Sequence, residues 1–328
     1  MNHRPFARTG RPVSEIGLGC WQLGGSDWGD VADDQAFAIL RAAVDSGVDF
    51  LDTADVYGAG RSEELIGRFL KTIDQPIFVA TKLGRRGDPG WPENFTEAAI
   101  RKHTEDSLRR LGVDAIDLTQ LHCIPTEQLE RGDVFESLRR LQQEGKIKAF
   151  GASVESDDQA RICLRQPDLA SLQIIFNIFR QKPATEVFRD AKAKGVALIV
   201  RLPLASGLLS GKMRKDTTFA ANDHRLYNRD GQAFNVGETF AGIPYETAVE
   251  LSDGLKALTP DGMTMAEMAV RWILDFDAVT TVIPGATRPD QAIGNARASG
   301  LASLGAALHN QLSEYYDQRV RKHIRGPY

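Results

Sequence analysis

The stretch FLDTADVYGAGRSEELIG, residues 50–67, places an acid and a phenol between an apolar strand and a helix. The strand ends at Asp52, Tyr57 follows five residues later, and a glycine-bracketed turn comes next at 58–60. We predict that the helix begins directly after this turn, with Ser62 as its N-cap and two glutamates in its first turn. Loops of this kind carry the chemistry of many α/β folds, so the stretch predicts a functional loop.

The same order of apolar strand, loop and amphipathic helix recurs along the chain. The strands, such as PIFVATK and AIDLTQLH, are nearly continuous apolar runs, which is typical of parallel strands covered on both faces. Seven such units precede residue 210, and TTVIPG near residue 283 supplies an eighth strand. Eight units predict an α/β fold of the closed (β/α)8 TIM-barrel type, which needs about 250 residues. An open, doubly wound sheet is the alternative.

Several segments extend this plan, and we expect them to belong to one domain spanning residues 1–328. One of them, the segment 211–243, is a polar loop that is too long for a plain connection, and loops of that length are usually functional. We expect it to close over a cofactor or substrate with His224, Arg225, Tyr227 and Arg229. The additions are an N-terminal β-hairpin over 4–16 that caps the barrel bottom, the long loop at 211–243, an extra helix before strand eight, and a C-terminal helix over roughly 305–322.

Composition limits the possible partners and the compartment. The net charge is -4 and no basic block is present, which argues against nucleic acid as a partner. No stretch approaches the ~20 apolar residues of a membrane span. The only cysteines are Cys20, Cys123 and Cys163, too few for a disulfide framework. We therefore expect a cytoplasmic protein with a small-molecule substrate, and the sequence indicates no oligomeric state.

Ionisable residues stand at the ends of three neighbouring predicted strands. Asp52 ends the second strand, Lys82 the third and His122 the fourth, and Tyr57 follows just beyond the second. In a (β/α)8 barrel the C-terminal ends of all strands meet at one mouth. Buried ionisable groups are costly unless they are paired, so we expect these four side chains to contact one another.

These four side chains predict a proton-donating site. A tyrosine titrates near ~10 and is a weak acid at neutral pH, but a nearby ammonium lowers that pKa. Lys82 supplies the cation, Asp52 keeps it charged, and His122 orients a carbonyl oxygen beside the phenol. Tyr57 is then the general acid when a carbonyl accepts hydride, and the general base in the reverse direction.

The signals for a nucleotide lie at the far end of the chain. The first strand gives GLGCWQ, in which Gln22 breaks the Rossmann pattern of glycines. The glycines of LPLASGLLSGK, residues 202–212, let backbone amides approach a pyrophosphate. In IPGATRPDQAIGN, residues 283–295, Pro289 suits the first position of a helix, so its N-terminus and Arg288 form an anion site. A 2′-phosphate on Arg288 favours NADP over NAD.

The chain resembles the aldo-keto reductases over essentially its whole length, especially bacterial members with a large loop after strand seven. The resemblance rests on DTADVYGAGRSEELIG, VATKLG, DLTQLHCIP, QIIFN, LPLASGLLSGK and IPGATRPDQAIGN, in the family's order and spacing. It implies a (β/α)8 barrel that binds NADPH in extended form and moves hydride between it and a carbonyl or alcohol. The catalytic group implied by the resemblance is Asp52, Tyr57, Lys82 and His122.

The resemblance also implies a set of cofactor contacts, with Trp21 placed more toward the substrate pocket. These contacts come from Gly19, Trp21 and Asp52, from Ser153, Gln173 and Arg201 around the nicotinamide, from Leu204, Ser206, Gly207 and Leu209 along the pyrophosphate, and from Gly285, Thr287, Arg288, Gln291 and Asn295 at the adenosine phosphate.

Two positions depart from the family's pattern. Ser153 is followed by Val154 where Asn is common, so one contact to the nicotinamide amide is missing. Arg201 stands where many members carry the aromatic residue that stacks under the nicotinamide. Its guanidinium either stacks there or reaches an anionic or hydroxyl-rich substrate. Together with the polar loop it hints at a sugar or polyol, and the direction of reaction stays open.

Two other functions compete with an NADP-dependent oxidoreductase. The first is a cofactor-loaded regulatory or interaction protein with little turnover, which channel-associated members of the fold resemble. The second is a metal-dependent barrel hydrolase. The six histidines show neither H-x-H nor H-E-x-x-H spacing, so no metal is expected.

Overall fold

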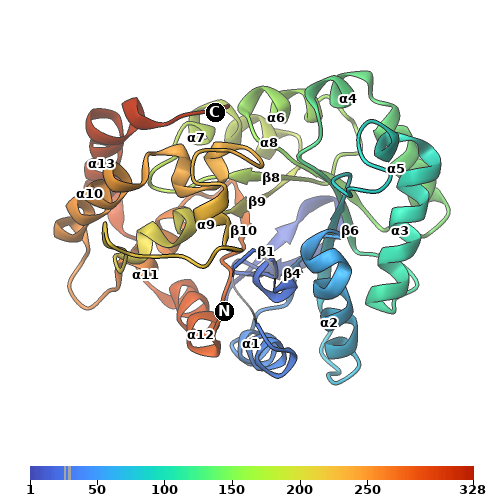
Figure 1. Ribbon diagram of the computed structural model, residues 1–328, viewed down its shortest axis with the longest axis horizontal. Helices are drawn as coiled ribbons and strands as arrows, with labels where there is room; N and C mark the ends of the chain where they lie inside the picture. Colours follow the sequence, from blue (N-terminus) through green and yellow to red (C-terminus); the bar gives the residue numbers. More distant parts are fainter. Residues whose placement is uncertain (26, 29–30) are drawn as a thin grey trace.

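The computed structural model describes residues 1–25, 27–28 and 31–328, and its centre is a barrel of parallel strands (Figure 1). Neighbouring strands pair in chain order, and bridges from Ile16 to Val282 and from Gly19 to Gly285 join the last strand to the first. The sheet therefore closes, which confirms the (β/α)8 prediction and excludes the doubly wound alternative. The strands are β3 (Leu18–Gly19), β4 (Phe50–Asp52), β5 (Phe78–Leu83), β6 (Leu118–His122), β7 (Phe150–Ser153), β8 (Ser171–Ile175), β9 (Ala197–Arg201) and β10 (Val279–Val282).

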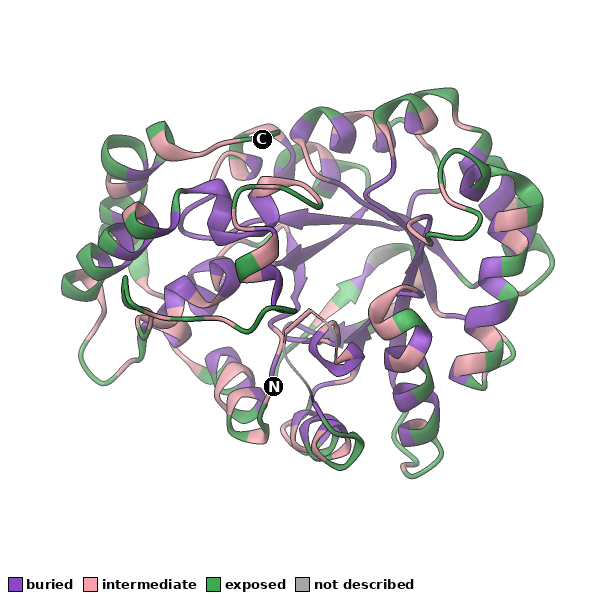
Figure 2. Cartoon of the chain, viewed as in Figure 1, coloured by how far each residue is buried: buried purple, intermediate pink, exposed green. Residues whose placement is uncertain are grey.

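Helices surround the barrel, and the sides that they turn toward it are buried (Figure 2). In α2, for example, Leu65, Ile66 and Phe69 are buried, whereas Glu64 and Arg68 are exposed. No helix formed by the described residues is long and apolar enough to cross a membrane. The helices are α1 (Asp33–Asp45), α2 (Arg61–Leu70), α3 (Glu97–Leu111), α4 (Thr126–Arg131), α5 (Asp133–Gln143), α6 (Asp157–Cys163), α7 (Pro183–Glu186), α8 (Phe188–Ala193), α9 (His224–Tyr227), α10 (Tyr245–Leu255), α11 (Met265–Leu274), α12 (Pro289–Arg297) and α13 (Gly305–Tyr315).

The predicted additions to the barrel are present. The N-terminal hairpin pairs β1 (His3–Phe6) with β2 (Arg11–Ser14). The ring of Phe6 lies 5.0 Å from Phe78 and 6.2 Å from Phe50, at the N-terminal ends of β5 and β4, so the hairpin plugs the bottom of the barrel. Helices α10 and α11 both precede β10, and α13 follows the last unit.

One local prediction is wrong. Helix α2 begins at Arg61, two residues earlier than a helix capped by Ser62 would, and its N-cap is Gly60 in the left-handed region. Ser62 is not a cap because its hydroxyl is used elsewhere: it donates to Cys20 O at 2.8 Å and accepts from Thr53 Oγ1 at 2.9 Å.

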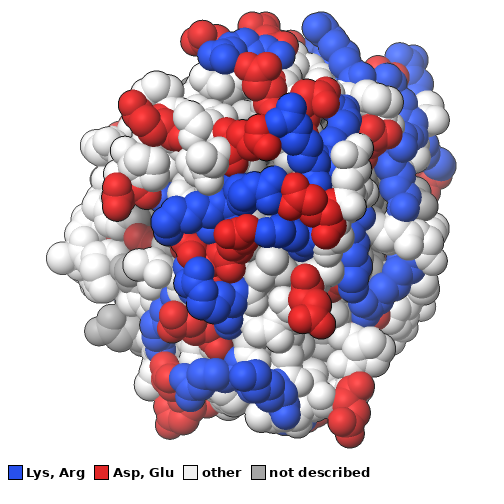
Figure 3. Space-filling view, turned by 90° about the vertical axis from the view of Figure 1, so that its right-hand side faces the viewer, with Lys and Arg blue, Asp and Glu red and all other residues white. Residues whose placement is uncertain are grey.

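The face formed by α3 and α5 carries many charges of both signs (Figure 3). Cross-helix and loop pairs connect them, such as Arg101 Nη1 to Glu144 at 2.5 Å and Lys148 Nζ to Asp117 at 2.8 Å. Exposed pairs of this kind contribute little to stability individually. Lys and Arg side chains lie next to Asp and Glu side chains across much of this face (Figure 3).

His103, on α3, is expected to make the fold sensitive to acid. Its side chain is 1% exposed, and burial, with Arg86 adding to the effect, lowers its pKa to about 4. The unfolded chain takes up this proton near pH ~6.5, so His103 contributes stability above that pH that is lost as the pH falls toward 4. Urea unfolding at pH 7 and pH 4.5 measures the loss. His103→Gln is expected to reduce the loss by about 1–2 kcal/mol, and an unchanged loss contradicts the prediction.

Candidate active site

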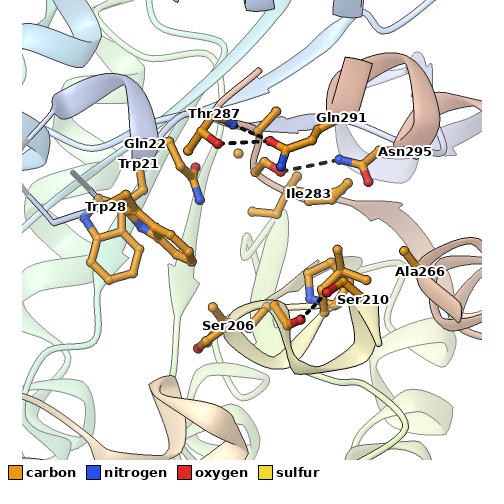
Figure 4. A pocket seen from close by; sticks show the side chains of 18 of the residues that line it. Trp21, Gln22, Trp28, Ser206, Ser210, Ala266, Ile283, Thr287, Gln291 and Asn295 are labelled. Carbon is orange, nitrogen blue, oxygen red and sulfur yellow. Dashed lines mark hydrogen bonds between the residues drawn. The ribbon is translucent and has the colours of Figure 1, made fainter. Parts of the chain in front are cut away.

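A cavity of about 710 Å³ opens at the C-terminal ends of the barrel strands (Figure 4). That volume suits a small-molecule or cofactor site. Most of the residues that the sequence predicted for the site lie on its wall. They are Gly19, Trp21, Asp52, Tyr57, His122, Ser153, Gln173, Arg201, Leu204, Ser206, Gly207, Gly285, Thr287, Arg288, Gln291 and Asn295.

Two of the residues predicted for the catalytic group and the cofactor contacts do not line the cavity. Lys82 lies behind the wall, where it contacts both Asp52 and Tyr57. Leu209 departs from the prediction altogether. Its side chain is fully buried in the core, and its backbone N–H donates to Leu204 O at 3.1 Å, so neither group faces a ligand.

The strand register explains why the polar residues gather. Successive side chains of a strand alternate in direction, so Lys82 points to the same side as Phe78 and Ala80 of β5. Phe78 and Ala80 belong to the apolar cluster that fills the barrel interior. In the same way Asp52 lies two residues after Phe50 in β4, so its side chain points to the same side as that of Phe50, which also belongs to this cluster. The polar site is thus the uppermost layer of the barrel interior, directly above its apolar filling.

Lys82 is the central hydrogen-bond donor of the site. Its Nζ donates to Asp52 Oδ1 at 2.5 Å, to Thr53 O at 2.8 Å and to Tyr57 Oη at 3.3 Å. The side chain is 1% exposed, so all three ammonium protons are used within the protein. An ammonium held this way is kept charged by the carboxylate and aimed at the phenol.

The Asp52 carboxylate is itself held from the other side. Its Oδ2 accepts from Gln173 Nε2 at 2.7 Å and from Gln120 Nε2 at 3.2 Å. Gln120 was missed by the sequence prediction, although a signal existed: it precedes His122 by two residues in β6 and therefore points to the same side. Gln173, expected at the nicotinamide amide, lies between Asp52 and Ser153, whose Oγ donates to its Oε1 at 3.3 Å.

The pKa of Tyr57 corrects one expectation. Burial raises this pKa to about 12, and Lys82 opposes the rise without reversing it. The predicted net lowering is therefore wrong for the protein alone, because the cost of burying a phenolate exceeds the attraction of one ammonium already paired with Asp52. The phenol holds its proton at neutral pH.

A strained turn fixes the loop that carries Tyr57. Gly58 and Ala59 both adopt left-handed backbone angles, with φ of 59° and 54°. A Cβ atom on Gly58 would lie 2.2 Å from Gly24 O, so no other residue fits there. The turn therefore presses against the loop after β3 and holds the phenol in place.

His122 completes the polar layer as a neutral imidazole. Its ring meets the ring of Tyr57 edge-on, with 5.7 Å between centroids. Burial, with Lys82 and Arg85 adding to it, lowers the pKa of His122 well below its usual value. Its Nδ1 is buried and has no hydrogen-bond partner among the described residues.

Thr287 and Gln291, at the N-terminus of α12, line the cavity beside Gln22, and Trp21 and Trp28 lie on the other side of Gln22 (Figure 4). As predicted, Pro289 is the first residue of α12, and Thr287 and Arg288 precede it. The side-chain oxygen of Gln291 accepts from Thr287 N at 2.8 Å and from Arg288 N at 3.2 Å. The exposed Arg288 guanidinium pairs with Asp290 at 3.0 Å.

The long loop at 211–243 is attached to the cavity through Ser206. This residue adopts a left-handed φ of 58°, and its hydroxyl donates to Glu238 O at 3.0 Å and accepts from Phe240 N at 3.2 Å. The Ser206 hydroxyl is thus committed to the loop. Within that loop, Phe219 and Arg225 line the cavity. Of its other predicted residues, His224 packs on Trp21 with 4.8 Å between rings.

Arg201 is held at the wall by a carboxylate that the sequence did not reveal. Its Nη1 lies 3.4 Å from Glu238 Oε2, while its Nη2 donates to Val154 O at 3.2 Å and contacts Cys123 Sγ at 3.5 Å. Glu238 comes from the long loop, where no periodic pattern marks it. Ligand-type atoms of Cys123, Glu155 and Glu238 lie within 4.8 Å of one another. The Arg201 guanidinium supplies the positive charge there, and burial raises the pKa of the Cys123 thiol, so the group does not suit a metal.

Comparison with known proteins identifies relatives across the whole barrel. The model of the Aldo/keto reductase family matches residues 15–317. The aldo-keto reductase YhdN of Bacillus subtilis is 33% identical over 298 residues, which are 89% of this chain and 86% of that protein. The NADH-specific methylglyoxal reductase of Escherichia coli is 27% identical over 336 residues, 96% and 99% of the two chains. The structure of the glycerol dehydrogenase AKR11B4 from Gluconobacter oxydans matches with a TM-score of 0.76 and 31% identity, over 97% of this chain and 96% of that one.

Proposed function

Because this chain belongs to the aldo/keto reductase family, we propose that it is an NADP-dependent oxidoreductase that interconverts a small carbonyl compound and its alcohol. The observation that carries the proposal is the hydrogen bonding of one buried ammonium, Lys82, to both Asp52 and Tyr57 at the base of the cavity. The buried free thiols of all three cysteines support a reducing compartment such as the cytoplasm.

The residues of the cavity suit a phosphate-bearing dinucleotide. The N-terminus of α12 and the Arg288 guanidinium offer a dipole and a cation to a phosphate. The side-chain amide of Gln22 lies on the same wall, and its buried Oε1 has no hydrogen-bond partner in the described part of the chain. An unpaired buried amide is costly, so a ligand that bonds to it is expected. NADPH, when bound, supplies the hydride.

Side chains of the protein donate the proton and stabilise the phenolate that its loss leaves. Tyr57 enters the reduction protonated, because burial raises its pKa to about 12. As the carbonyl oxygen gains negative charge, the phenol gives it a proton, and the phenolate that forms is stabilised by the Lys82 ammonium 3.3 Å away. Asp52 keeps Lys82 charged. His122, neutral and beside the phenol, orients the same oxygen without adding a competing charge.

Two measurements test this function together. Titration with NADPH is expected to quench the fluorescence of Trp21 and Trp28, which line the cavity. Aldehydes are then expected to cause NADPH oxidation. Binding without turnover over a panel of aldehydes and sugars favours the regulatory or interaction protein instead. Absence of binding refutes both functions.

Arg288 is expected to set the preference for NADP over NAD. Among the described residues its exposed guanidinium pairs with Asp290, and such a surface pair contributes little, so the guanidinium remains available to a 2′-phosphate. Arg288→Ala is expected to weaken NADPH binding about tenfold and to leave NADH binding unchanged. Fluorescence titration with each nucleotide measures both, and Arg189→Ala, at an arginine 92% exposed on α8, is the control. Equal losses for the two nucleotides contradict the assignment.

A further inference from the structure

The charges beside the catalytic group indicate what kind of substrate the cavity accepts. Arg201 is a cation on the wall near the phenol, and it carries its own carboxylate: Glu238 Oε2 lies 3.4 Å from its Nη1. Arg85 also approaches Glu238, with 3.8 Å between Nη1 and Oε1. An anionic substrate on Arg201 would therefore have to displace Glu238 or lie next to it. Like charges placed together at a site cost several kcal/mol.

A second carboxyl group strengthens this exclusion. Glu155 and Glu238 bring oxygens within 4.8 Å of each other. Burial, together with the Glu238 carboxylate, raises the pKa of Glu155. The Glu238 carboxylate thus already disfavours a negative charge on Glu155. A negatively charged substrate beside Arg201 would add a third such charge, which is disfavoured further.

The other end of the cavity is built differently. Lys212 lies on the cavity wall near the loops proposed to hold the cofactor phosphates, and within the described ranges no carboxylate pairs with its ammonium. In the part of the chain that the structure describes, the Arg288 guanidinium pairs with an exposed carboxylate, that of Asp290. Where phosphates are expected, cations are therefore available, whereas near Tyr57 Arg201 is paired with the buried carboxylate of Glu238, which Arg85 also approaches. This contrast indicates that the substrate, which binds in the cavity beside the cofactor, is uncharged.

A hydroxyl group satisfies the Arg201–Glu238 pair better than a methyl or a carboxylate does. Glu238 Oε1 and Arg201 Nε are buried and have no hydrogen-bond partner among the residues described. A hydroxyl donates to the carboxylate and accepts from the guanidinium at the same time, whereas a carboxylate has no proton to donate. The indole of Trp21, stacked on Tyr57 at 5.8 Å between centroids, offers an apolar face to the carbon skeleton.

The geometry points to a small, uncharged hydroxyaldehyde or polyol as the substrate, with Arg201 and Glu238 recognising a hydroxyl next to the reacting carbon. This inference rests on the proposed oxidoreductase function. Of the two kinds of substrate that Arg201 alone left open, anionic and hydroxyl-rich, it favours the hydroxyl-rich one.

Three aldehydes of equal length test the inference: glycolaldehyde with a hydroxyl, acetaldehyde with a hydrogen, and glyoxylate with a carboxylate. With NADPH and wild-type protein, kcat/KM for the free aldehyde form is expected to be about tenfold higher for glycolaldehyde than for acetaldehyde. Glyoxylate is expected at least about 100-fold below glycolaldehyde. Glyoxylate as the best substrate, or no preference among the three, overturns the inference. If NADPH binds and none of the three aldehydes is reduced, the proposed function fails and the inference fails with it.

Glu238→Gln then identifies the residue responsible. This change removes the charge and preserves the shape, so the glyoxylate-to-glycolaldehyde ratio of kcat/KM is expected to rise about tenfold or more, with NADPH affinity retained. Asp230→Asn removes one negative charge from the same loop, at an exposed pair with Arg325, and is expected to leave the ratio unchanged. An unchanged ratio in a Glu238→Gln protein that still binds NADPH overturns the role of Glu238. If that variant does not fold, the wild-type preference decides.

Discussion

Tyr57→Phe is expected to lower the turnover of carbonyl reduction by roughly two to four orders of magnitude. The phenylalanine ring keeps the contacts with Trp21 and His122 but cannot supply the proton. Neither His122 nor Lys82 is expected to take over this role. The pKa of His122 is lowered well below its usual value, so its imidazole is neutral. The Lys82 ammonium donates its three hydrogen bonds to Asp52, Thr53 and Tyr57. Aldehyde-dependent oxidation of NADPH under saturating cofactor measures the loss.

Two controls separate this loss of a proton donor from damage to the fold. NADPH affinity, followed by protein fluorescence, is expected to stay within about twofold of the wild type, because the phenol is proposed to contact the carbonyl rather than the cofactor. Tyr315→Phe is the matched change, since that hydroxyl donates to Leu251 O at 2.8 Å and lies outside the cavity. Full activity in Tyr57→Phe refutes the assignment of the general acid.

The polar layer above the barrel interior was predictable because it follows from topology and from the alternation of side chains along strands. Asp52 and His122 are the last residues of β4 and β6, Lys82 is the last but one of β5 between them, and parallel strands of a closed barrel bring such ends to one mouth. Gln120 obeys the same rule and was missed only because it lies inside its strand rather than at its end.

Other features depend on long-range packing, which the sequence does not encode in a periodic form. The pKa of Tyr57 is governed by how deeply the phenol is buried, and this depends on loops distant in sequence. Glu238 reaches Arg201 from an irregular loop, so neither residue predicts the other. Ser62 matches the composition of an N-cap, but the neighbouring Cys20 and Thr53 engage its hydroxyl instead.

The second large effect is expected from the buried ion pair beneath the phenol. Lys82→Met leaves the Asp52 carboxylate, which is 2% exposed, without its cation. Removing one partner of a buried pair costs about 3–5 kcal/mol, and we expect the lower part of this range because Gln120 and Gln173 still donate to Asp52. Urea unfolding at pH 7 measures the free energy of unfolding.

The double variant Asp52→Asn, Lys82→Met distinguishes an unpaired charge from lost packing. With no carboxylate left to compensate, it is expected to be more stable than Lys82→Met alone by about 1–3 kcal/mol, although it has one substitution more. Both variants are expected to lose activity, because Tyr57 has no ammonium beside its phenolate in either. If the double variant is the less stable of the two, packing rather than charge explains the loss, and Lys82 and Asp52 do not act as the coupled pair on which the acidity of Tyr57 is proposed to depend.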